Sequence, residues 1–289
     1  MDIVCRVHRR PEPGETVLGG EALFIPGGKG ANQAVAAARL GGNVHFLGRV
    51  GNDAFGSQLL KGLRENQVQA ECVKITDGVS SGCALILVDD KGENSIVVAP
   101  GANHRLTPED IRETETLIAK AGYVLLQLEI PLETAIEAVS ICRRHGVFTI
   151  LDPAPAPLGG LPDSLFRVDL LTPNQSEAES ILGMEAGDIM TTGARLLEKG
   201  AGCVVLKRGA EGAMVFQGKN ALPVESFRVD AKDTTAAGDA FTAALAVALN
   251  EGMEMKKAAR FACAAGALCC TRLGAQSSLP FRNDVDRFC

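Results

Sequence analysis

The amino-acid sequence predicts a layered α/β fold built around a mainly parallel sheet. Short apolar runs recur along the chain, and such runs are typical of strands buried on both faces of a parallel sheet. Segments with helical apolar periodicity separate these runs, which is the alternation expected of layered α/β proteins. Two further segments contain strand patterns without a helix between them, and they predict a smaller β structure outside the core.

Five short apolar or β-branched runs are predicted strands. They cover residues 44–50, 123–128, 147–151, 168–171 and 203–206. The last four runs are continuously apolar, so we expect helices to bury both of their faces.

Helical patterns fill much of the chain between these strands. Asp53 is the expected N-cap of a helix that runs to about residue 66, because Phe55, Leu59 and Leu63 repeat at helical spacing. Further helices are predicted over residues 108–120, 132–145, 175–182 and 189–199.

Residues 16–25 and 82–99 interrupt the alternation of strands and helices. The second segment predicts a hairpin, because the turn between its two apolar halves carries Asp and Gly residues. Such strands do not belong to a parallel core, so we expect a small antiparallel β-sheet lid over a site. The lid segments, about residues 3–25 and 82–99, lie within a single domain over residues 1–289.

Composition excludes several classes of function. The chain has 289 residues, with 29 Lys and Arg against 35 Asp and Glu, so its net charge is −6. It contains no basic block that would indicate nucleic acid as a partner. No signal peptide is expected, and the longest apolar stretches are shorter than the roughly 20 residues of a membrane span. Nine cysteines without a CxxC pair indicate buried thiols in a reducing cytoplasm.

Three glycines within four positions precede an alanine-rich helix. Gly27, Gly28 and Gly30 allow a ligand to approach the backbone closely, and Lys29 and Asn32 supply hydrogen-bond donors at the helix start. The segment is not a P-loop, because Gly30 rather than Ser or Thr follows Lys29. It predicts either a ligand site or a tight turn before a stable helix.

A second group of small residues opens the apolar helix that runs to residue 249. Ala236, Ala237 and Gly238 have almost no side chain, so their backbone amides can form an anion hole at the helix N-terminus. Asp239 follows in the first turn, where its carboxylate could accept a proton from a hydroxyl group. These are the parts that phosphoryl transfer needs, and an acidic residue that only favours the helix dipole is the alternative.

Two segments that follow predicted strands complete the candidate residues. Asn174 and Glu177 lie on one side of a helical turn, where they could hold a hydrated Mg²⁺ or serve as an ordinary N-cap and its partner. Lys207, Gly209 and Gly212 belong to a glycine-containing loop that could pass beside a nucleotide.

Together these segments resemble the ribokinase-like, or phosphofructokinase-B-type, carbohydrate kinases. The resemblance extends from about residue 2 to the C-terminus, and its motifs occur in family order. They lie at residues 13–17 (PGETV), 27–41 (GGKGANQAVAAARLG), 127–129 (QLE), 152–156 (DPAPA), 174–177 (NxxE), 233–241 (DTTAAGDAF) and 271–276 (TRLGAQ). The resemblance implies a three-layer α/β/α domain with a β-sheet lid.

The resemblance also implies an enzyme that transfers a phosphoryl group from ATP to the 5-hydroxyl of D-ribose. In that reaction Asp239 would be the catalytic base, and the amides of residues 236–238 would form the anion hole. The implied sugar-binding residues are Asp2, Gly28, Lys29, Asn32, Glu129 and Asp233. The alternatives are a related sugar or nucleoside kinase, such as a deoxyribokinase, and a truncated, weakly active or non-catalytic sugar-binding protein.

Nucleotide and cation sites follow from the same resemblance. The implied ATP-binding residues are Asn174, Glu177, Lys207, Gly209, Gly212 and Cys263, with Mg²⁺ held by Glu177 through water. The implied ligands of an activating monovalent cation, usually K⁺, are Asp233, Thr235, Cys269, Arg272, Gly274 and Ser278, mostly through backbone carbonyl groups. A homodimer joined through the lid strands is also expected.

Two features depart from the family pattern. Cys263 stands where a polar Asn or His is expected near the adenine. In addition, the family has a first core strand ending in Gly-Ser-x-Asn before the position of Met1 and Asp2. We therefore expect the first core strand to be missing, Asp2 to lie on a frayed end, and Met1 to be an internal methionine of a longer reading frame.

Overall fold

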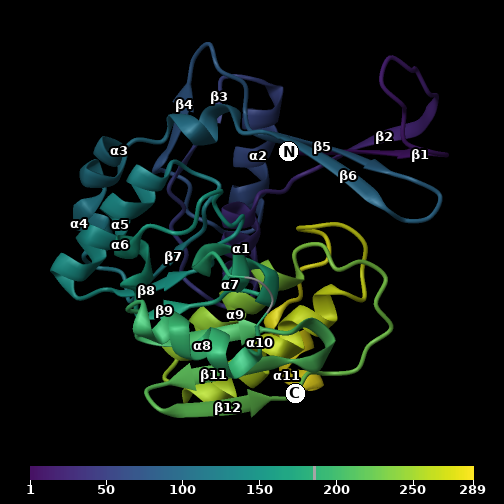
Figure 1. Ribbon diagram of the computed structural model, residues 1–289. Helices are drawn as coiled ribbons and strands as arrows, with labels where there is room; N and C mark the ends of the chain where they lie inside the picture. The colour runs from purple at the N-terminus through teal and green to yellow at the C-terminus, as the bar shows by residue number, and fades with distance from the viewer. Residues whose placement is uncertain (185–186) are drawn as a thin grey trace.

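Six strands form the main sheet of the structure, in the order β12-β11-β10-β9-β8-β7. The computed structural model describes residues 1–184 and 187–289 (Figure 1). Strands β7 to β10 run parallel, whereas β11 and β12 run antiparallel to their neighbours. These strands are β7 (Tyr123–Leu126), β8 (Phe148–Leu151), β9 (Leu170–Leu171), β10 (Cys203–Lys207), β11 (Ala213–Gln217) and β12 (Asn220–Val224).

Side-chain alternation along these strands explains why helices cover both faces of the sheet. Ile150 of β8 packs into one apolar cluster, whereas its neighbour Leu151 packs into another. Val205 and Val204 of β10 divide between the same two clusters. Because both faces are buried, these strands have continuous apolar sequences instead of alternating ones.

The helices form the two outer layers of an α/β/α core (Figure 1). One cluster contains residues of α1, α9 and α10, and the other contains residues of α5, α7 and α8. The helices are α1 (Lys29–Arg39), α2 (Ala54–Glu65), α3 (Pro108–Glu113), α4 (Glu115–Ile118), α5 (Leu132–His145), α6 (Asp163–Phe166), α7 (Gln175–Leu182), α8 (Ile189–Glu198), α9 (Ala237–Asn250), α10 (Met255–Cys269) and α11 (Arg282–Phe288), with 3₁₀ turns η1 (Gly101–Arg105) and η2 (Gly209–Glu211).

Four strands form the lid, which projects away from the core in Figure 1. They are β1 (Asp2–Val7), β2 (Gly19–Ile25), β5 (Cys83–Val88) and β6 (Asn94–Ala99), in the order β2-β1-β5-β6. The prediction of a purely antiparallel lid is wrong at one pairing, because β1 runs parallel to β5. Strand β1 is the first strand of the hairpin β1–β2, and β5 is the first strand of the hairpin β5–β6. Both hairpins project away from the core, so β1 and β5 run in the same direction.

Asp2 is held within the lid sheet. It pairs with Ile25 on β2 and with Ala84 on β5. The expectation that Asp2 lies on a frayed end is therefore wrong, because strand pairing on both sides fixes its backbone.

Strands β3 (Gly48–Gly51) and β4 (Val73–Thr76) form a separate parallel pair. Within residues 1–184 and 187–289, neither strand pairs with β7, so the parallel strands are divided between two sheets.

Several predicted elements are confirmed at residue level. Helices α5 and α7 have the predicted bounds, and Asp53 caps α2 through a hydrogen bond from the Gly56 amide. The helix predicted over residues 108–120 is broken at Thr114, which ends α3 and precedes α4. In the described part of the chain, no helix is both long and apolar enough to cross a membrane.

Candidate active site

The candidate active site lies where parallel strands end and helices begin. Glu129 and Asp152 follow β7 and β8, Asn174 follows β9, and Lys207 is the last residue of β10. The N-termini of α1 and α9 supply residues to the same place, because Asn32 of α1 contacts Asp239 of α9. Ligands of open α/β sheets bind at the carboxyl ends of the strands.

The first turn of α9 has the backbone of an anion-binding helix terminus. Ala236 adopts a left-handed conformation with φ of 61°, and it is the N-cap of the helix. The first bond of the helix runs from the Ala240 amide to the Ala236 carbonyl, at 2.8 Å. The amides of Gly238 and Asp239 precede this bond, whereas the Ala237 amide already donates to the Thr234 carbonyl at 3.2 Å. Of the residues predicted to form an anion hole, Ala237 therefore has an amide that is already bonded, whereas the amides of Gly238 and of the following Asp239 have no backbone acceptor in the described part of the chain.

Asp239 is a buried carboxylate that neutral amides hold in place. Its oxygens accept hydrogen bonds from Asn32 Nδ2 at 2.9 Å and from Gln33 Nε2 at 3.2 Å. Burial raises the pKa of Asp239 to about 6, although Lys29 and the Asn32 hydrogen bond act in the opposite direction. The carboxylate is therefore ionised at neutral pH and can still accept a proton there.

Asn32 Oδ1 is a buried acceptor without a protein partner in the described part of the chain. The amide nitrogen of the same side chain is bonded to Asp239, so the oxygen points away from that carboxylate. Buried polar atoms in folded proteins almost always have a partner. An unpaired buried acceptor beside a carboxylate is a place where a bound water molecule or a ligand group can donate a hydrogen bond.

Asp2, Lys29 and Glu129 gather at the lid side of this carboxylate. Glu129 Oε2 accepts a hydrogen bond from the Lys29 amide at 2.8 Å. A methyl group on Gly27 would come within 2.2 Å of the Asp2 carboxylate, so only glycine fits there. Burial raises the pKa of both Asp2 and Glu129. The structure thus brings together three of the residues predicted to bind the sugar, which lie far apart in the sequence.

Lys29 is a cation surrounded by carboxylates. Burial lowers the pKa of its amino group, but the charges of Asp239, Asp152 and Glu129 outweigh burial and raise this pKa overall. Lys29 therefore remains positively charged among these carboxylates.

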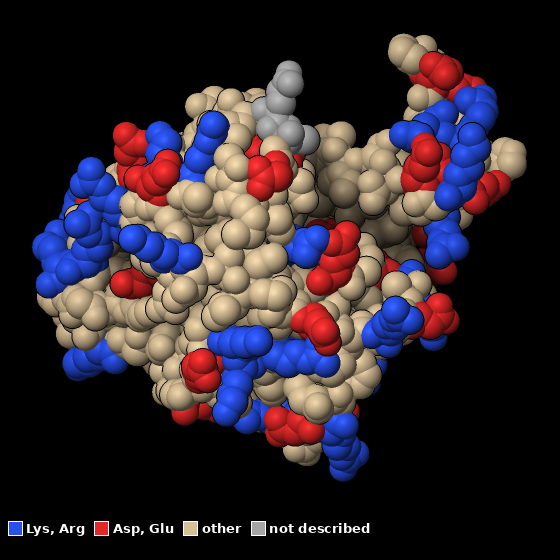
Figure 2. Space-filling model, turned by 60° about the horizontal axis from the view of Figure 1, so that its bottom comes forward, with Lys and Arg blue, Asp and Glu red and all other residues tan. Residues whose placement is uncertain are grey.

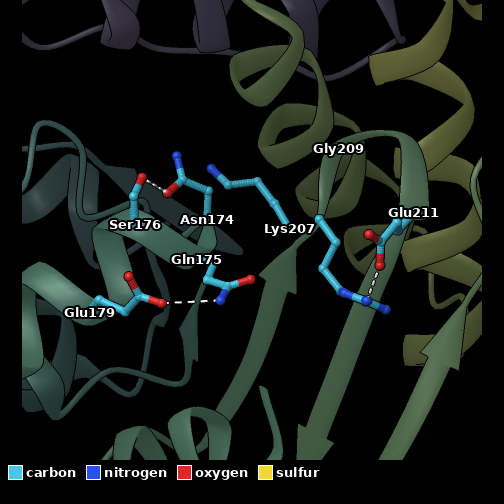
Figure 3. A pocket seen from close by; sticks show the side chains of 8 residues that line it. Asn174, Gln175, Ser176, Glu179, Lys207, Gly209 and Glu211 are labelled. Carbon is cyan, nitrogen blue, oxygen red and sulfur yellow. Dashed lines mark hydrogen bonds and ion pairs between the residues drawn. The ribbon is translucent and has the colours of Figure 1, made fainter. Parts of the chain in front are cut away.

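A cavity of about 500 Å³ lies beside this cluster, and Figure 3 shows its lining. It is open to solvent between the start of α7 and the loop after β10. Asn174, Lys207 and Gly209 line it, as the nucleotide prediction requires. Gly212 is not among the lining residues, and a methyl group there would come within 2.1 Å of the Val224 carbonyl oxygen. Its role in the structure is to let two backbone segments pass closely.

Asn174 and Glu177 form the capping box that was the alternative to a magnesium site. Asn174 Oδ1 accepts from the Glu177 amide, and Glu177 Oε2 accepts from the Asn174 amide, both at 2.8 Å. Ser176 also donates to Asn174 Oδ1 at 2.8 Å, as Figure 3 shows. Only one oxygen of Glu177 takes part in the capping box.

Asp233 organises the loop predicted to bind a monovalent cation. Its carboxylate accepts hydrogen bonds from the amide and hydroxyl of Thr235 and from the Gly274 amide, at 2.9, 2.6 and 2.8 Å. Burial raises the pKa of Asp233, but these hydrogen bonds outweigh burial and hold the pKa below its ordinary value. Cys269 Sγ lies 3.0 Å from Ser278 Oγ and 3.5 Å from the Thr235 carbonyl oxygen.

Two predicted residues lie apart from these groups. The side chain of Arg272 points to Asp284 at 3.5 Å, so only its backbone could serve a cation in the loop. Cys263 belongs to the apolar core, and it is not among the residues that line the cavity between α7 and the loop after β10. Within residues 1–184 and 187–289, no group of three or more His, Cys, Asp or Glu side chains is arranged to hold a metal ion.

Sequence reasoning did not assign a role to Gln33 or Asp152, although both lie within quoted motifs. Each is only 1% exposed, and each contacts a predicted site residue: Gln33 contacts Asp239, and Asp152 contacts Lys207. Asp152 directly follows a parallel strand, and this position was the available signal. Gln33 gave no such signal, because its partners lie 119 and 206 residues further along the chain.

Comparison with known proteins agrees with this geometry. Residues 1–282 match the family described as pfkB family carbohydrate kinase. A ribokinase of Bacillus subtilis is 42% identical over 287 residues, which cover 99% of this chain and 95% of the relative. A deoxyribokinase of Salmonella typhi is 35% identical, over 97% of this chain and 92% of the relative. The structure of Arabidopsis thaliana ribokinase complexed with ribose and ATP matches with a TM-score of 0.91 and 33% identity, over 99% of this chain and 95% of that chain.

A buried carboxylate at a helix N-terminus, beside an open polar cavity, defines a phosphotransferase site. The chain belongs to the pfkB family of carbohydrate kinases, since the family match covers residues 1–282 and the similarity to characterised kinases extends over nearly the whole chain.

Proposed function

We propose that this protein transfers the γ-phosphoryl group of ATP to the 5-hydroxyl of D-ribose, giving D-ribose 5-phosphate and ADP. The observation that carries the proposal is the buried pair of Asp239 and Asn32. The carboxylate can take a hydroxyl proton, and the unpartnered Asn32 Oδ1 can accept a hydrogen bond from a neighbouring hydroxyl of the sugar. Similarity to ribokinases over the full chain supports ribose as the sugar.

The reaction requires one proton transfer and one displacement at phosphorus. Asp239 takes the proton of the 5-hydroxyl, and the resulting oxygen attacks the γ-phosphorus of ATP. A phosphorus–oxygen bond to the sugar forms while the bond to the β-phosphate oxygen breaks, and ADP leaves with that electron pair. Since the pKa of Asp239 is raised to about 6, the base is ionised at neutral pH before the sugar binds.

The N-terminus of α9 and Lys207 would stabilise negative charge on the transferring group. The amides of Gly238 and Asp239 are placed at the positive end of the helix. A methyl group on Gly238 would lie 3.6 Å from Lys207 Nζ, so this cation lies close to the same amides. Preorganised donors of this kind lower the barrier because they need no rearrangement during the reaction.

The polar groups at the lid side would recognise the remaining sugar hydroxyls. Asp2 and Glu129 offer carboxylate acceptors, Lys29 offers an ammonium donor, and Gly28 leaves its backbone open to the sugar. Asp233 belongs to the same prediction, but its carboxylate is occupied by loop hydrogen bonds. A sugar without the matching hydroxyl would leave a buried group unpaired, which is how such sites discriminate.

ATP and Mg²⁺ would bind at the cavity between α7 and the loop after β10. Glu177, with Asn174 beside it, would hold the ion through water, because the capping box leaves one Glu177 oxygen available. Hard oxygen ligands of this kind suit Mg²⁺. When bound, the ion supplies positive charge to the phosphate oxygens.

A monovalent cation, K⁺ by preference, would bind in the loop that Asp233 organises. The carboxylate of Asp233, the carbonyl of Thr235 and the hydroxyl of Ser278 are oxygen donors within one small region. Oxygen donors without a cluster of acidic side chains fit a singly charged ion better than a divalent one. Replacing K⁺ by tetramethylammonium is expected to lower kcat, and an unchanged kcat would contradict this part of the proposal.

A homodimer joined through the lids would cover the exposed apolar residues of that sheet. Its apolar surface consists of side chains that are about half exposed or more: Leu23, Phe24, Leu85, Ile96, Val97 and Val98. The strand register places Phe24, Leu85 and Val97 on one face of the sheet and Leu23, Ile96 and Val98 on the other. Exposed apolar side chains on a projecting sheet with open edges need a cover, and a second lid offers the same chemistry. Sedimentation at micromolar concentration is expected to give a dimer for the wild type and a monomer for Val97→Lys, with Leu158→Lys outside the lid as the exposed control. A monomeric wild type would contradict the dimer.

Cytoplasmic localisation is part of the same proposal. All nine cysteines are unpaired, which a reducing compartment allows.

A panel of sugars tests the substrate. The wild type is assayed for ADP formation with ATP, Mg²⁺, K⁺ and each of D-ribose, 2-deoxy-D-ribose, D-fructose and adenosine. The highest kcat/KM is expected with D-ribose. The similarity to a deoxyribokinase makes 2-deoxy-D-ribose the competing substrate, and a higher kcat/KM for it would overturn the choice of ribose.

A further inference from the structure

A buried line of side chains joins the carboxylate of Asp239 to the amino group of Lys207. Its two middle members, Gln33 and Asp152, are each 1% exposed. Neither lines the nucleotide cavity, and neither belongs to the sugar-side group around Glu129. Burying a polar side chain costs desolvation free energy, so such side chains need hydrogen-bond partners. Gln33 and Asp152 each contact a charged group of the site.

The Gln33 side chain bridges two carboxylates. Its Nε2 atom donates to Asp152 Oδ2 at 3.0 Å and to Asp239 Oδ1 at 3.2 Å. The Gln33 carbonyl oxygen accepts a hydrogen bond from Gln127 Nε2. The orientation of the amide follows from chemistry, because ionised carboxylates only accept hydrogen bonds and must face the NH₂ group.

Asp152 holds Lys207 from the other side. Asp152 Oδ1 accepts a hydrogen bond from Lys207 Nζ at 2.8 Å, and the hydroxyl of Thr242 lies 3.4 Å from Oδ2. The Lys207 side chain is 12% exposed and ends next to Gly238 in the first turn of α9. A largely buried lysine whose amino group is held by an ion pair presents its charge at one place.

We infer that Gln33 and Asp152 are positioning residues for phosphoryl transfer, which fix the base Asp239 and the cation Lys207 relative to each other. This inference rests on the proposed function, in which Asp239 takes the proton and Lys207 stabilises the transferring group. Gln33 supplies one of the two side-chain donors of Asp239, and Asp152 supplies the only ion pair of Lys207 within residues 1–184 and 187–289.

Two substitutions shift the protonation of Asp239 in opposite directions. Gln33→Met keeps the side-chain length but removes a donor from the carboxylate, which disfavours its ionised form. Asp152→Asn removes a negative charge that raises the pKa of Asp239, so it favours the ionised form. A general loss of packing would not produce shifts of opposite sign.

The experiment measures kcat and kcat/KM for the sugar against pH, at saturating ATP and Mg²⁺. Gln33→Met is expected to move the acid limb of kcat/KM up by about one pH unit, and Asp152→Asn to move it down. Asp152→Asn is also expected to lower kcat at the pH optimum about tenfold, because Lys207 loses its partner. Gln33→Glu replaces Gln33→Met if the latter does not fold, and a third carboxyl group should shift the limb upward as well.

Thr134→Val is the matched control. Thr134 is fully buried and donates to the Leu106 carbonyl at 2.7 Å, in a cluster that does not include site residues. This variant also loses a buried hydrogen bond, yet its acid limb should coincide with that of the wild type. Acid limbs that stay in place, or that move in the same direction in both site variants, would overturn the inference.

The experiment can contradict the positioning role of Gln33 and Asp152 without contradicting the proposed function. The assay uses the sugar for which the wild type has the highest kcat/KM. A wild type that is active, with variants that keep its pH profile, overturns the positioning role alone. A wild type that phosphorylates no sugar overturns the proposed function together with this inference.

Discussion

Asp239 and Asp110 are two buried carboxylates at the same position of two helices, and their pKa values are shifted in opposite directions. Each is the third residue of its helix, and their exposed fractions are 4% and 6%. The helix dipole favours the ionised form of both. Nevertheless, the pKa of Asp239 is raised to about 6, whereas that of Asp110 lies well below its ordinary range.

The partners explain the difference. Burial raises the pKa of both groups, but Asp110 receives two hydrogen bonds from the Arg49 guanidinium and one from the Lys74 amino group, at 2.7–2.8 Å. Arg49 and Lys74 are neighbours across β3 and β4, so this carboxylate ties α3 to that strand pair. Asp239 is instead held by the neutral amides of Asn32 and Gln33. Cationic partners make a structural carboxylate, and neutral partners leave a carboxylate that can accept a proton.

The largest expected effect concerns turnover. Asp239→Asn cannot accept the hydroxyl proton, so we expect kcat to fall about 10³-fold while the Kd for ATP stays unchanged. ADP release and isothermal titration measure the two quantities. Asp110→Asn is the matched control, and it should keep near wild-type kcat at temperatures where it is folded. Substantial turnover by Asp239→Asn would remove Asp239 from the role of base.

The next effect concerns stability at the structural carboxylate. Asp110→Asn leaves Arg49 and Lys74 without their charge partner, so the free energy of unfolding at pH 7 should fall by about 2 kcal/mol. Because the folded pKa of Asp110 is depressed, its contribution is complete above the unfolded pKa near 4 and is lost as pH falls through the folded value. Urea unfolding of both proteins should therefore converge in strong acid. Equal stability at pH 7 would contradict the account of Asp110.

The smallest effect has the opposite sign. The folded pKa of Asp239 is about 6 and exceeds the unfolded value near 4, so ionisation of this group destabilises the fold above pH 6. Asp239→Asn removes this destabilisation but also loses one hydrogen bond. The free energy of unfolding at pH 8 should therefore rise by about 1 kcal/mol in total. The gain should vanish at pH 4, where both forms are neutral. A variant less stable than the wild type at pH 8 would break the comparison.

Much of the fold could be predicted because local signals and tertiary structure agree. The apolar periodicity of α5 and the capping residue of α7 placed both helices at their observed bounds. Strands β11 and β12 were not predicted, because they form an antiparallel hairpin at one side of the sheet and their sequences are less uniformly apolar than the parallel core. The parallel pairing of β1 with β5 depends on how two distant hairpins leave the core, and no local pattern contains that information.

The candidate site, like the fold, has a part that the sequence could predict and a part that it could not. The first turn of α9 and the glycines before α1 were found because backbone geometry imposes small residues at those points. The bridge through Gln33 could not be found, because it depends on three segments that meet only in the folded chain. The absence of Cys263 from the lining of the cavity could not be foreseen for the same reason.

The most direct test of the account is the pH dependence of ribose-dependent ADP formation by the wild type. kcat/KM for ribose reports the ionisation of the enzyme before the sugar binds. We expect kcat/KM for ribose to fall tenfold for each pH unit below an apparent pKa near 6, and we expect the same profile for Asp110→Asn. A rate that does not depend on ribose, or a profile that is flat from pH 5 to pH 8, would contradict the account.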